Sequence, residues 1–178
     1  METISGSTFL LRPVHPADAE ALARYADNRK IWENVKDAFP HPYTVGHARD
    51  FIKYLQRHEE EIVFAIEVEG EMAGSIGLKH KTDVYRINRE LGFWLGEPFW
   101  GRGIVSEAVG LIVDYGFRHT GARRIYAEVY AHNRGSMSVL ERNGFRHEAV
   151  LRRAVIKDEK VEDLHIFALL KTEWESRI

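Results

Sequence analysis

The 178-residue sequence contains no cysteine. This absence excludes disulfide bridges, thiolate metal sites and a cysteine nucleophile. It also fits a reducing compartment, so we expect a cytoplasmic protein. Residues 1–16 have no long apolar core behind a basic start, which predicts that no signal peptide is present. No apolar run approaches the ~20 residues of a membrane span, so we expect no membrane partner.

An excess of charge is missing as well. There are 25 Lys and Arg residues against 27 Asp and Glu, a formal net charge of −2, which gives no reason to expect a nucleic-acid partner. The 9 histidines include no His-Glu-x-x-His spacing, so we predict no metal site. No repeat or linker interrupts the chain. Its length therefore favours one domain over residues 1–178. A monomer or a homodimer is expected, and the sequence does not decide between them.

Hydrophobic periodicity gives the expected elements. Pro16 is expected to open a helix, and Gly121 and Gly144 to end two others. The other expected helices are a short one within 28–44 and one over 45–61. The two helices ended by glycine start near Val105 and at 133. The expected strands are 8–12, a hairpin over 62–80, 89–96, 123–132, and a final hairpin of 145–156 and 161–170. Adjacent strands mixed with helices predict an α+β sheet.

The glycine-rich stretch "FWGRGIVSEA" (99–108) lies between an expected strand and an expected helix. The first N–H groups of a helix have no partner within the helix and carry partial positive charge, so they can bind a phosphate. Gly101 and Gly103 remove the Cβ atoms that would keep an anion away, and Arg102 adds a charge. The stretch is either a pyrophosphate cradle or an ordinary strand-to-helix turn.

Two nucleotide motifs fit this stretch poorly. A P-loop needs Lys-Ser/Thr where Arg102 and Gly103 stand. Gly101, Gly103 and Ser106 approach the Gly-x-Gly-x-x-Gly dinucleotide fingerprint, and Glu128 stands near the expected acidic spacing. However, the stretch follows three earlier strands in a sheet that does not alternate β with α. Dinucleotide binding is kept as an alternative.

Three segments resemble one family. "LRPVHPADAEAL" (11–22), "RELGFWLGEPFWGRGIVSEAVGLIVDYGF" (89–117) and "RIYAEVYAHNRGSMSVLERNGFRHEAVLRR" (124–153) are similar, in order, to GNAT N-acetyltransferases. The match is narrower with the RimJ/RimL-like subgroup of ribosomal-protein N-terminal acetyltransferases. The resemblance implies a GNAT fold, with a mostly antiparallel, twisted seven-stranded sheet flanked by helices and splayed between its fourth and fifth strands. It also implies acetyl-CoA as co-substrate and direct acetyl transfer to a primary amine.

The resemblance also implies which residues bind acetyl-CoA. Backbone groups of the strand would meet the acetyl and pantetheine parts, the loop would hold the pyrophosphate, and Asn133 would bind the pantetheine arm. Separately from the resemblance, the 3′-phosphate has three candidate partners, the pairs Arg123-Arg124 and Arg152-Arg153 and the single Arg142, and the two pairs are otherwise surface residues. The predicted acetyl-CoA contacts are Phe93, Trp94, Leu95, Trp100, Gly101, Arg102, Gly103, Ile104, Val105, Ser106, Asn133, Ser136 and Arg142. Val105 and Leu140 depart from the family pattern. Leu140 stands where many members carry a tyrosine that protonates the leaving thiolate.

Direct transfer needs a neutral amine, and therefore a base. Strand alternation places Glu90 opposite the apolar face, and the family's strand can carry a glutamate that acts through water. Glu90 is thus the candidate base, or else a carboxylate paired with Arg86, Arg89 or a lysine. Ser136 either donates to the leaving thiolate or only helps Asn133 cap its helix.

The irregular segment at 28–44 is where the subgroup binds its acceptor. The resemblance implies acceptor contacts for Trp32, Asn34, Phe39 and Tyr43, together with Glu90. The sequence leaves a protein N-terminus, a polyamine, an aminoglycoside and other small amines open as acceptors. It also leaves open a non-catalytic acyl-CoA sensor of the same fold.

Overall fold

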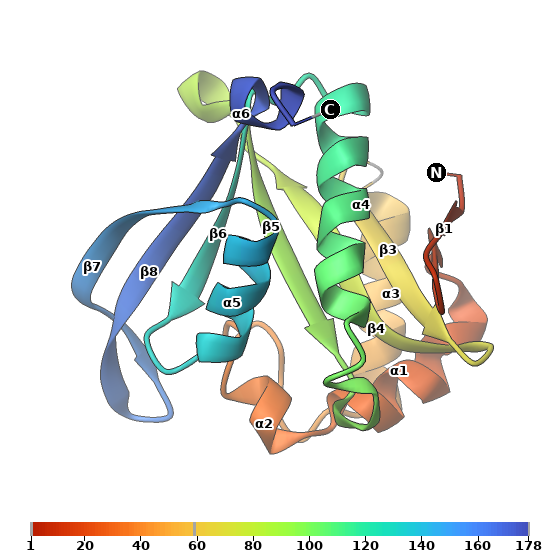
Figure 1. Ribbon diagram of the computed structural model, residues 1–178. Coiled ribbons are helices and arrows are strands. Elements are labelled where there is room, and N and C mark those ends of the chain that lie inside the picture. Colours follow the sequence, from red (N-terminus) through yellow and green to blue (C-terminus); the bar gives the residue numbers. More distant parts are fainter. Residues whose placement is uncertain (1, 59, 178) are drawn as a thin grey trace. The chain divides into compact units, whose positions relative to one another are not determined.

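The computed structural model describes residues 2–58 and 60–177 (Figure 1). The chain divides into two compact units, here called the first and second units. The first comprises Met1–Gly77 and Phe93–Ala108, and the second Leu78–Gly92 and Val109–Ile178. Three elements contribute residues to both units: β4 (Glu71–His80), β5 (Asn88–Leu95) and α4 (Ile104–His119).

The first unit holds the N-terminal strands and helices. Its further elements are β1 (Ile4–Ser5), β2 (Leu10–Pro13), a 3-10 turn (Pro16–Asp18), α1 (Ala19–Ala26), α2 (Arg29–Trp32), α3 (Val45–Arg57) and β3 (Ile62–Val68). Strand β2 pairs antiparallel with both β1 and β3. The predicted helix after Pro16, the short helix within 28–44 and the helix from 45 are confirmed.

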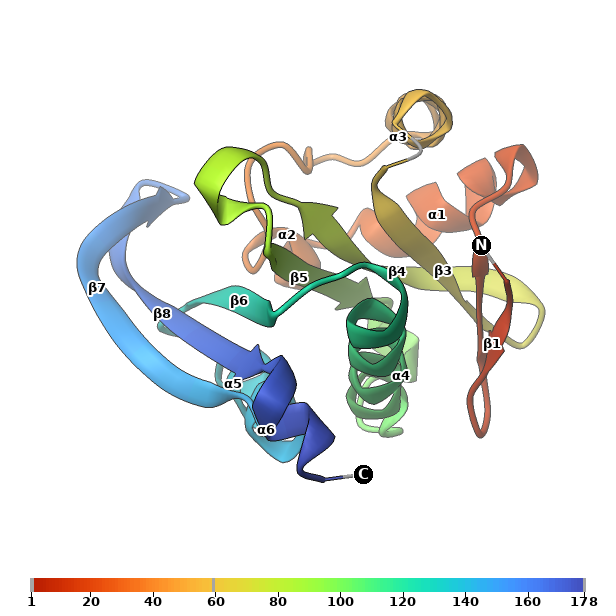
Figure 2. The same ribbon diagram turned by 90° about the horizontal axis from the view of Figure 1, so that it is seen from above.

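Helices α1 and α3 pack their apolar faces into one core with the sheet. Thr44 caps α3 by accepting a hydrogen bond from the His47 N–H at 3.2 Å. The core includes Leu22 of α1, Ile52 of α3 and Met72 of β4, each at most 4% exposed. Figure 2 shows both helices beside β3. Burial of these apolar faces, more than helix propensity, stabilises helices this short.

Strands β3 and β4 form the predicted hairpin. Its turn uses left-handed residues, Glu69 at φ 55° and Gly70 at φ 84°. Within β4, a Cβ atom on Gly74 would stand 2.3 Å from the Trp94 carbonyl oxygen. Glycine at position 74 therefore permits the backbone of β4 to approach the last residues of β5.

The second unit is built on a long hairpin. Its further elements are β6 (Arg124–Tyr130), α5 (Arg134–Arg142), β7 (Arg146–Lys157), β8 (Lys160–Leu170) and α6 (Lys171–Glu175). Strand β8 pairs antiparallel with both β6 and β7, and Figure 1 shows β7 and β8 as a curved ribbon. Phe117, Ile125 and Phe167 are at most 1% exposed and form part of the core. The predicted final hairpin is confirmed.

The strands are hydrogen-bonded in the order β1-β2-β3-β4-β5-β6-β8-β7. The expected seven strands are therefore eight, because the two-residue strand β1 adds an edge that is too short to show periodicity. The predicted class, a mixed α/β sheet flanked by helices, is confirmed. Strands β5 and β6 run parallel, and their pairing covers Asn88, Arg89 and Glu90, the first three residues of β5, as expected of a splay.

Candidate functional site

The glycine-rich loop is held at its start by backbone bonds. The Gly96 N–H donates to the Ala73 carbonyl at 2.7 Å. The Trp100 indole Nε1–H folds back and donates to the Leu95 carbonyl at 2.7 Å. A 3-10 turn, Glu97–Phe99, lies between these two anchors. The loop therefore leaves the last residue of β5 along a fixed path.

The two loop glycines both have a left-handed backbone conformation. Gly101 and Gly103 have φ values of 75° and 78°. A Cβ atom built on either meets nothing within 4 Å. Helix α4 starts at Ile104, one residue before the predicted Val105, and its first bond runs from the Glu107 N–H to the Gly103 carbonyl at 3.1 Å. The amides of Ile104 and Val105 thus precede the first helical donor, the Glu107 N–H, and have no acceptor within the helix, which is the position where a helix N-terminus can bind an anion.

The charges of the loop are paired within the first unit. Arg102 Nη1 donates to Glu69 Oε1 at 3.0 Å, and its guanidinium stands 5.3 Å from the centre of the Phe99 ring. The Glu107 carboxylate, in the first turn of α4, accepts from the Ser7 N–H at 2.7 Å and from Ser7 Oγ at 2.6 Å. Arg102 is half exposed, so the Glu69 pair is screened by solvent and is weak.

Three predicted residues form an aromatic cluster. The Phe39 ring lies 4.7 Å from the Tyr43 ring and 5.7 Å from the Trp94 ring, centre to centre. Burial raises the pKa of Tyr43 to about 12, so its phenol is neutral at pH 7. Trp32 instead packs on His41, 5.7 Å away. The structure thus brings together Phe39, Tyr43 and Trp94, while Trp32 has a different ring partner.

Asn34 has an unusual environment. Its Nδ2 donates to the Lys30 carbonyl at 2.8 Å. Its Oδ1 is buried and has no hydrogen-bond partner within the described part of the chain. A buried acceptor without a donor costs free energy, roughly 1–3 kcal/mol, unless something supplies the donor. In the predicted acceptor segment, Asn34 is thus a residue whose buried side-chain oxygen could accept a hydrogen bond from a ligand.

Glu90 is paired with a lysine. Lys81 Nζ donates to Glu90 Oε2 at 2.6 Å, and Tyr126 Oη donates to the same oxygen at 3.4 Å. The arginines named as alternatives make other contacts. Arg89 is 8% exposed and donates to the Thr120 carbonyl at 3.0 Å, and Arg86 donates to the Asp83 carbonyl at 3.0 Å. A lysine, one of the expected partners, is therefore found beside Glu90.

Helix α5 carries the other predicted residues. Asn133 Oδ1 accepts from the Ser136 N–H at 3.0 Å, so Asn133 is the N-cap that its type predicts. Leu140, in the slot of the family's tyrosine, is fully buried and packs in the core. Arg142 lies exposed in the last turn of α5. The capping role is confirmed, and contacts of Asn133, Ser136 and Arg142 with acetyl-CoA stay predictions.

Comparison with known proteins identifies the family. Residues 8–146 match the sequence profile described as "Acetyltransferase (GNAT) domain". The chain belongs to the GNAT acetyltransferase family. It is 32% identical over 182 residues to the "Probable N-acetyltransferase YjcK" of Bacillus subtilis, covering 97% of this chain and 99% of the relative. It is 29% identical over 173 residues to the [Ribosomal protein uS5]-alanine N-acetyltransferase of Escherichia coli, covering 93% and 89%.

Solved structures agree with the GNAT assignment. Mycobacterium smegmatis RimJ, in complex with CoA-disulfide, superposes with a TM-score of 0.87 at 25% identity, covering 97% of this chain and 88% of that one. The chain is an N-acetyltransferase of the GNAT family, and the dinucleotide-binding alternative falls away. The predicted resemblance to the RimJ/RimL-like subgroup is confirmed by these relatives.

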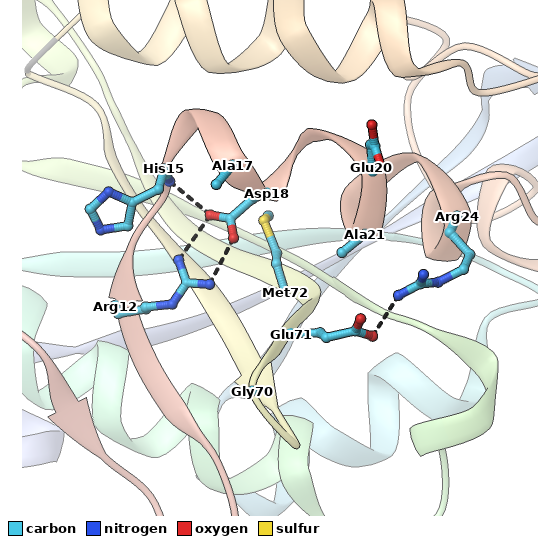
Figure 3. Close-up of a pocket in the computed structure, with 10 residues that line it drawn as sticks. All are labelled: Arg12, His15, Ala17, Asp18, Glu20, Ala21, Arg24, Gly70, Glu71 and Met72. Carbon is cyan, nitrogen blue, oxygen red and sulfur yellow. Dashed lines mark hydrogen bonds and ion pairs between the residues drawn. The ribbon is translucent and has the colours of Figure 1, made fainter.

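The GNAT enzyme also has a polar cavity of about 490 Å³ in its first unit (Figure 3). No predicted site residue lines it. Its lining residues come from β2, the 3-10 turn, α1 and the β3–β4 hairpin: Arg12, His15, Ala17, Asp18, Glu20, Ala21, Arg24, Gly70, Glu71 and Met72.

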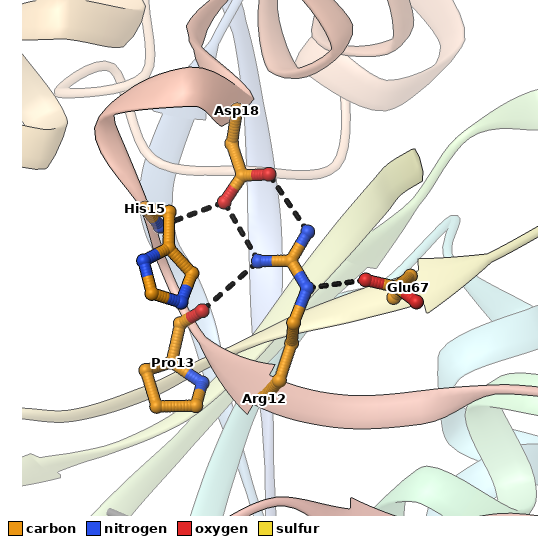
Figure 4. Close-up of polar contacts among 5 residues, drawn as sticks. All are labelled: Arg12, Pro13, His15, Asp18 and Glu67. Atoms are coloured by element: carbon orange, nitrogen blue, oxygen red, sulfur yellow. Dashed lines mark hydrogen bonds and ion pairs between the residues drawn. The ribbon is translucent and has the colours of Figure 1, made fainter. Parts of the chain in front are cut away.

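Two of the lining residues, Arg12 and Asp18, belong to an ion-pair network (Figure 4). The Arg12 guanidinium donates two hydrogen bonds to the Asp18 carboxylate, at 2.7 and 2.8 Å. It also donates hydrogen bonds to the Glu67 carboxylate and to the Pro13 carbonyl. Burial alone would raise the pKa of Asp18, but the bonds from Arg12 and from the His15 N–H outweigh it, and the net pKa is lowered. Arg12 is thus occupied in joining β2, the 3-10 turn and β3.

Across residues 2–58 and 60–177, no group of three or more His, Asp or Glu side chains is placed to hold a metal ion. In the same part of the chain, no helix combines the length and apolarity needed to cross a membrane.

Proposed function

We propose that this GNAT enzyme transfers acetyl from acetyl-CoA directly to a primary amine. The observation that carries the proposal is the loop at Gly101 and Gly103, with two left-handed glycines, open space at both Cβ positions and a helix N-terminus directly after them. These features suit a pyrophosphate. The absence of cysteine supports direct attack over a thiol acyl-enzyme.

In the first unit, we assign the pyrophosphate to the amides of the loop, from Trp100 to Ser106. Phe93, Trp94 and Leu95 would offer backbone groups of β5 to the acetyl carbonyl and pantetheine. Preorganised N–H donors of this kind stabilise a developing oxyanion. The aromatic cluster of Phe39, Tyr43 and Trp94 supports an acceptor role for the segment that also carries Trp32 and Asn34.

In the second unit, we assign the base to Glu90, the pantetheine contact to Asn133 and the 3′-phosphate contact to Arg142. The amine nitrogen attacks the thioester carbonyl carbon, and the C–N bond forms as the C–S bond breaks. The amine proton passes to the Glu90 carboxylate, directly or through one water. The CoA thiolate takes a proton from Ser136 or from solvent, because Leu140 offers none.

The acceptor that we favour is the α-amine of a protein N-terminus. With a pKa of 7.7–8.0, about a tenth of such amines is neutral at pH 7, against about 0.04% for a lysine-like amine near 10.4. The base therefore has to deprotonate a smaller fraction of the bound amine. The relative named for ribosomal protein uS5 alanine supports this choice. We further propose a single cytoplasmic domain, monomeric or homodimeric, without nucleic-acid or membrane partners.

Thiol release from acetyl-CoA tests the proposal. The acceptors would be a peptide with N-terminal alanine, the same peptide with a blocked N-terminus and one internal lysine, spermidine, and an aminoglycoside. We expect release with the free peptide and acetylation of its α-nitrogen by mass spectrometry. Thiol release with spermidine or the aminoglycoside, and not with the peptide, would show that the acceptor is a small-molecule amine and not a protein N-terminus. Binding of acetyl-CoA without release with any amine would favour the acyl-CoA sensor.

A further inference from the structure

The candidate base is part of a three-residue cluster in the second unit. Lys81 directly follows β4, Glu90 is the third residue of β5, and Tyr126 is the third residue of β6. Glu90 and Tyr126 stand opposite each other in the register of the two strands. Lys81 Nζ also lies 5.7 Å from the centre of the Tyr126 ring. The residue after β4 and the neighbouring strands β5 and β6 thus bring an ammonium, a carboxylate and a phenol together.

The cluster is largely removed from solvent. The Lys81 side chain is 28% exposed and the Glu90 side chain 12%. Burial alone lowers the pKa of Lys81, but its bonds to Glu90 and Tyr126 outweigh burial and the net pKa is raised. Burial raises the pKa of Tyr126. At neutral pH the lysine is therefore a fixed cation and the phenol is neutral, so neither can remove a proton from the acceptor.

The geometry gives Lys81 two effects on the carboxylate. Its ammonium bonds Glu90 Oε2, the oxygen that Tyr126 also reaches, so two donors from different elements fix the rotation of the carboxylate. An opposite charge at this distance favours the ionised form, typically by about 1–3 pH units. Ionisation and orientation are two of the properties that a general base needs before the amine arrives, and the ammonium supplies both while lowering the carboxylate's affinity for the proton.

We propose that Lys81 is a positioning residue for the reaction: it holds Glu90 ionised and oriented, and Tyr126 supports the same oxygen. The proposal rests on the proposed function, in which Glu90 receives the amine proton. Lys81 itself does not touch the substrates in this role. It keeps Glu90 available as a base at a pH where a carboxyl this far removed from solvent, without a cation beside it, would begin to take up a proton.

The test compares Lys81→Met with Lys81→Arg, and uses Lys79→Met as a matched control, since Lys79 is an exposed lysine two residues away on β4. The first readout is the pH profile of kcat/KM. In Lys81→Met we expect the acid limb to move to higher pH by about 1–3 units, with the acetyl-CoA KM unchanged. Lys81→Arg should keep the limb near its original pH. Lys79→Met should change neither parameter.

The second readout is independent of turnover. Carbon-13 NMR of labelled glutamate gives the titration midpoint of Glu90, assigned with Glu90→Gln, and the midpoint should rise in Lys81→Met. Should that variant fail to fold, Lys81→Gln keeps a donor but loses the charge and should give the same shift. An unchanged midpoint would overturn the role of Lys81. If the midpoint rises in Lys81→Met but Glu90→Gln keeps the acid limb of the pH profile, then Lys81 does hold Glu90 ionised, but Glu90 is not the base.

Discussion

Replacing Gly103 by aspartate or by asparagine separates the charge of the new side chain from its shape. The two residues are nearly isosteric, and both tolerate the left-handed region better than other side chains do. At φ 78°, with open space around the new Cβ, each should lower the free energy of unfolding by about 1 kcal/mol from the backbone alone. Any difference between the two variants in acetyl-CoA affinity then measures charge.

The size of that difference follows from Coulomb's law. Two unit charges 4 Å apart interact by ~1 kcal/mol in water and ~4 kcal/mol at an effective dielectric constant of 20. Gly103 is exposed, which argues for a value between these limits, about 2 kcal/mol. Gly103→Asp should therefore bind acetyl-CoA roughly 30-fold more weakly than Gly103→Asn. The ratio should shrink at about 1 M salt, where the Debye length falls to ~3 Å.

Isothermal titration calorimetry of both variants with acetyl-CoA, at low and high salt, measures this ratio. The matched pair Gly121→Asp and Gly121→Asn provides the control, because Gly121 has a φ of 67°, is equally open, and lies beyond the other end of α4. These two variants should bind acetyl-CoA alike. Equal dissociation constants for the two Gly103 variants would show that no phosphate docks at this loop.

Three further outcomes are expected. Glu90→Gln should lower kcat/KM at pH 7 by about 10²-fold and remove the acid limb of the pH profile; a fall of less than threefold with an unchanged profile would make Glu90 structural. Ser136→Ala should lower kcat by no more than the loss of one bond to a charged group, about 1.5–3 kcal/mol, or roughly 10- to 150-fold, whereas a wild-type kcat would leave Ser136 only a helix-capping role. Asp18→Asn breaks a nearly buried pair with Arg12 and should cost about 3 kcal/mol in urea unfolding at pH 7. Folding lowers the pKa of Asp18, so this stabilisation is complete above about pH 4, the pKa in the unfolded chain, and is lost as the pH falls through the pKa in the folded protein. The difference in unfolding free energy between wild type and variant should therefore narrow in acid. A difference that stays constant with pH would contradict the assignment.

Local patterns predicted the elements and the loop well. The path from strand to glycine turn to helix, the Asn133 cap and the hairpin turn at Gly70 all depend on neighbours within a few residues, which the sequence displays directly. Strand β1 was missed because its two residues, Ile4 and Ser5, are too few for a period.

Contacts between distant segments were harder to predict. For Glu90 the sequence offered Arg86, Arg89 or a lysine without saying which lysine, and the pairing of separate elements is what brings Lys81, nine residues away, to the carboxylate. The network of Arg12, Asp18 and Glu67 is not predictable from local pattern, because Arg12 and Glu67 are 55 residues apart in the sequence and nothing near either residue indicates their contact. Only the register of the strands decides such pairs, and register is a property of the whole sheet.

The hydrogen bond from the Trp100 indole to the Leu95 carbonyl makes Trp100 a fluorescent probe of the loop. The indole is 44% exposed and stands directly before Gly101, while its N–H is fixed to a backbone carbonyl. A ligand seated on the following amides would change the polarity around this ring. The chain has 4 tryptophans, so the difference in emission between the wild type and a Trp100→Phe variant isolates its signal. Stopped-flow fluorescence could then time the arrival of acetyl-CoA without any added dye.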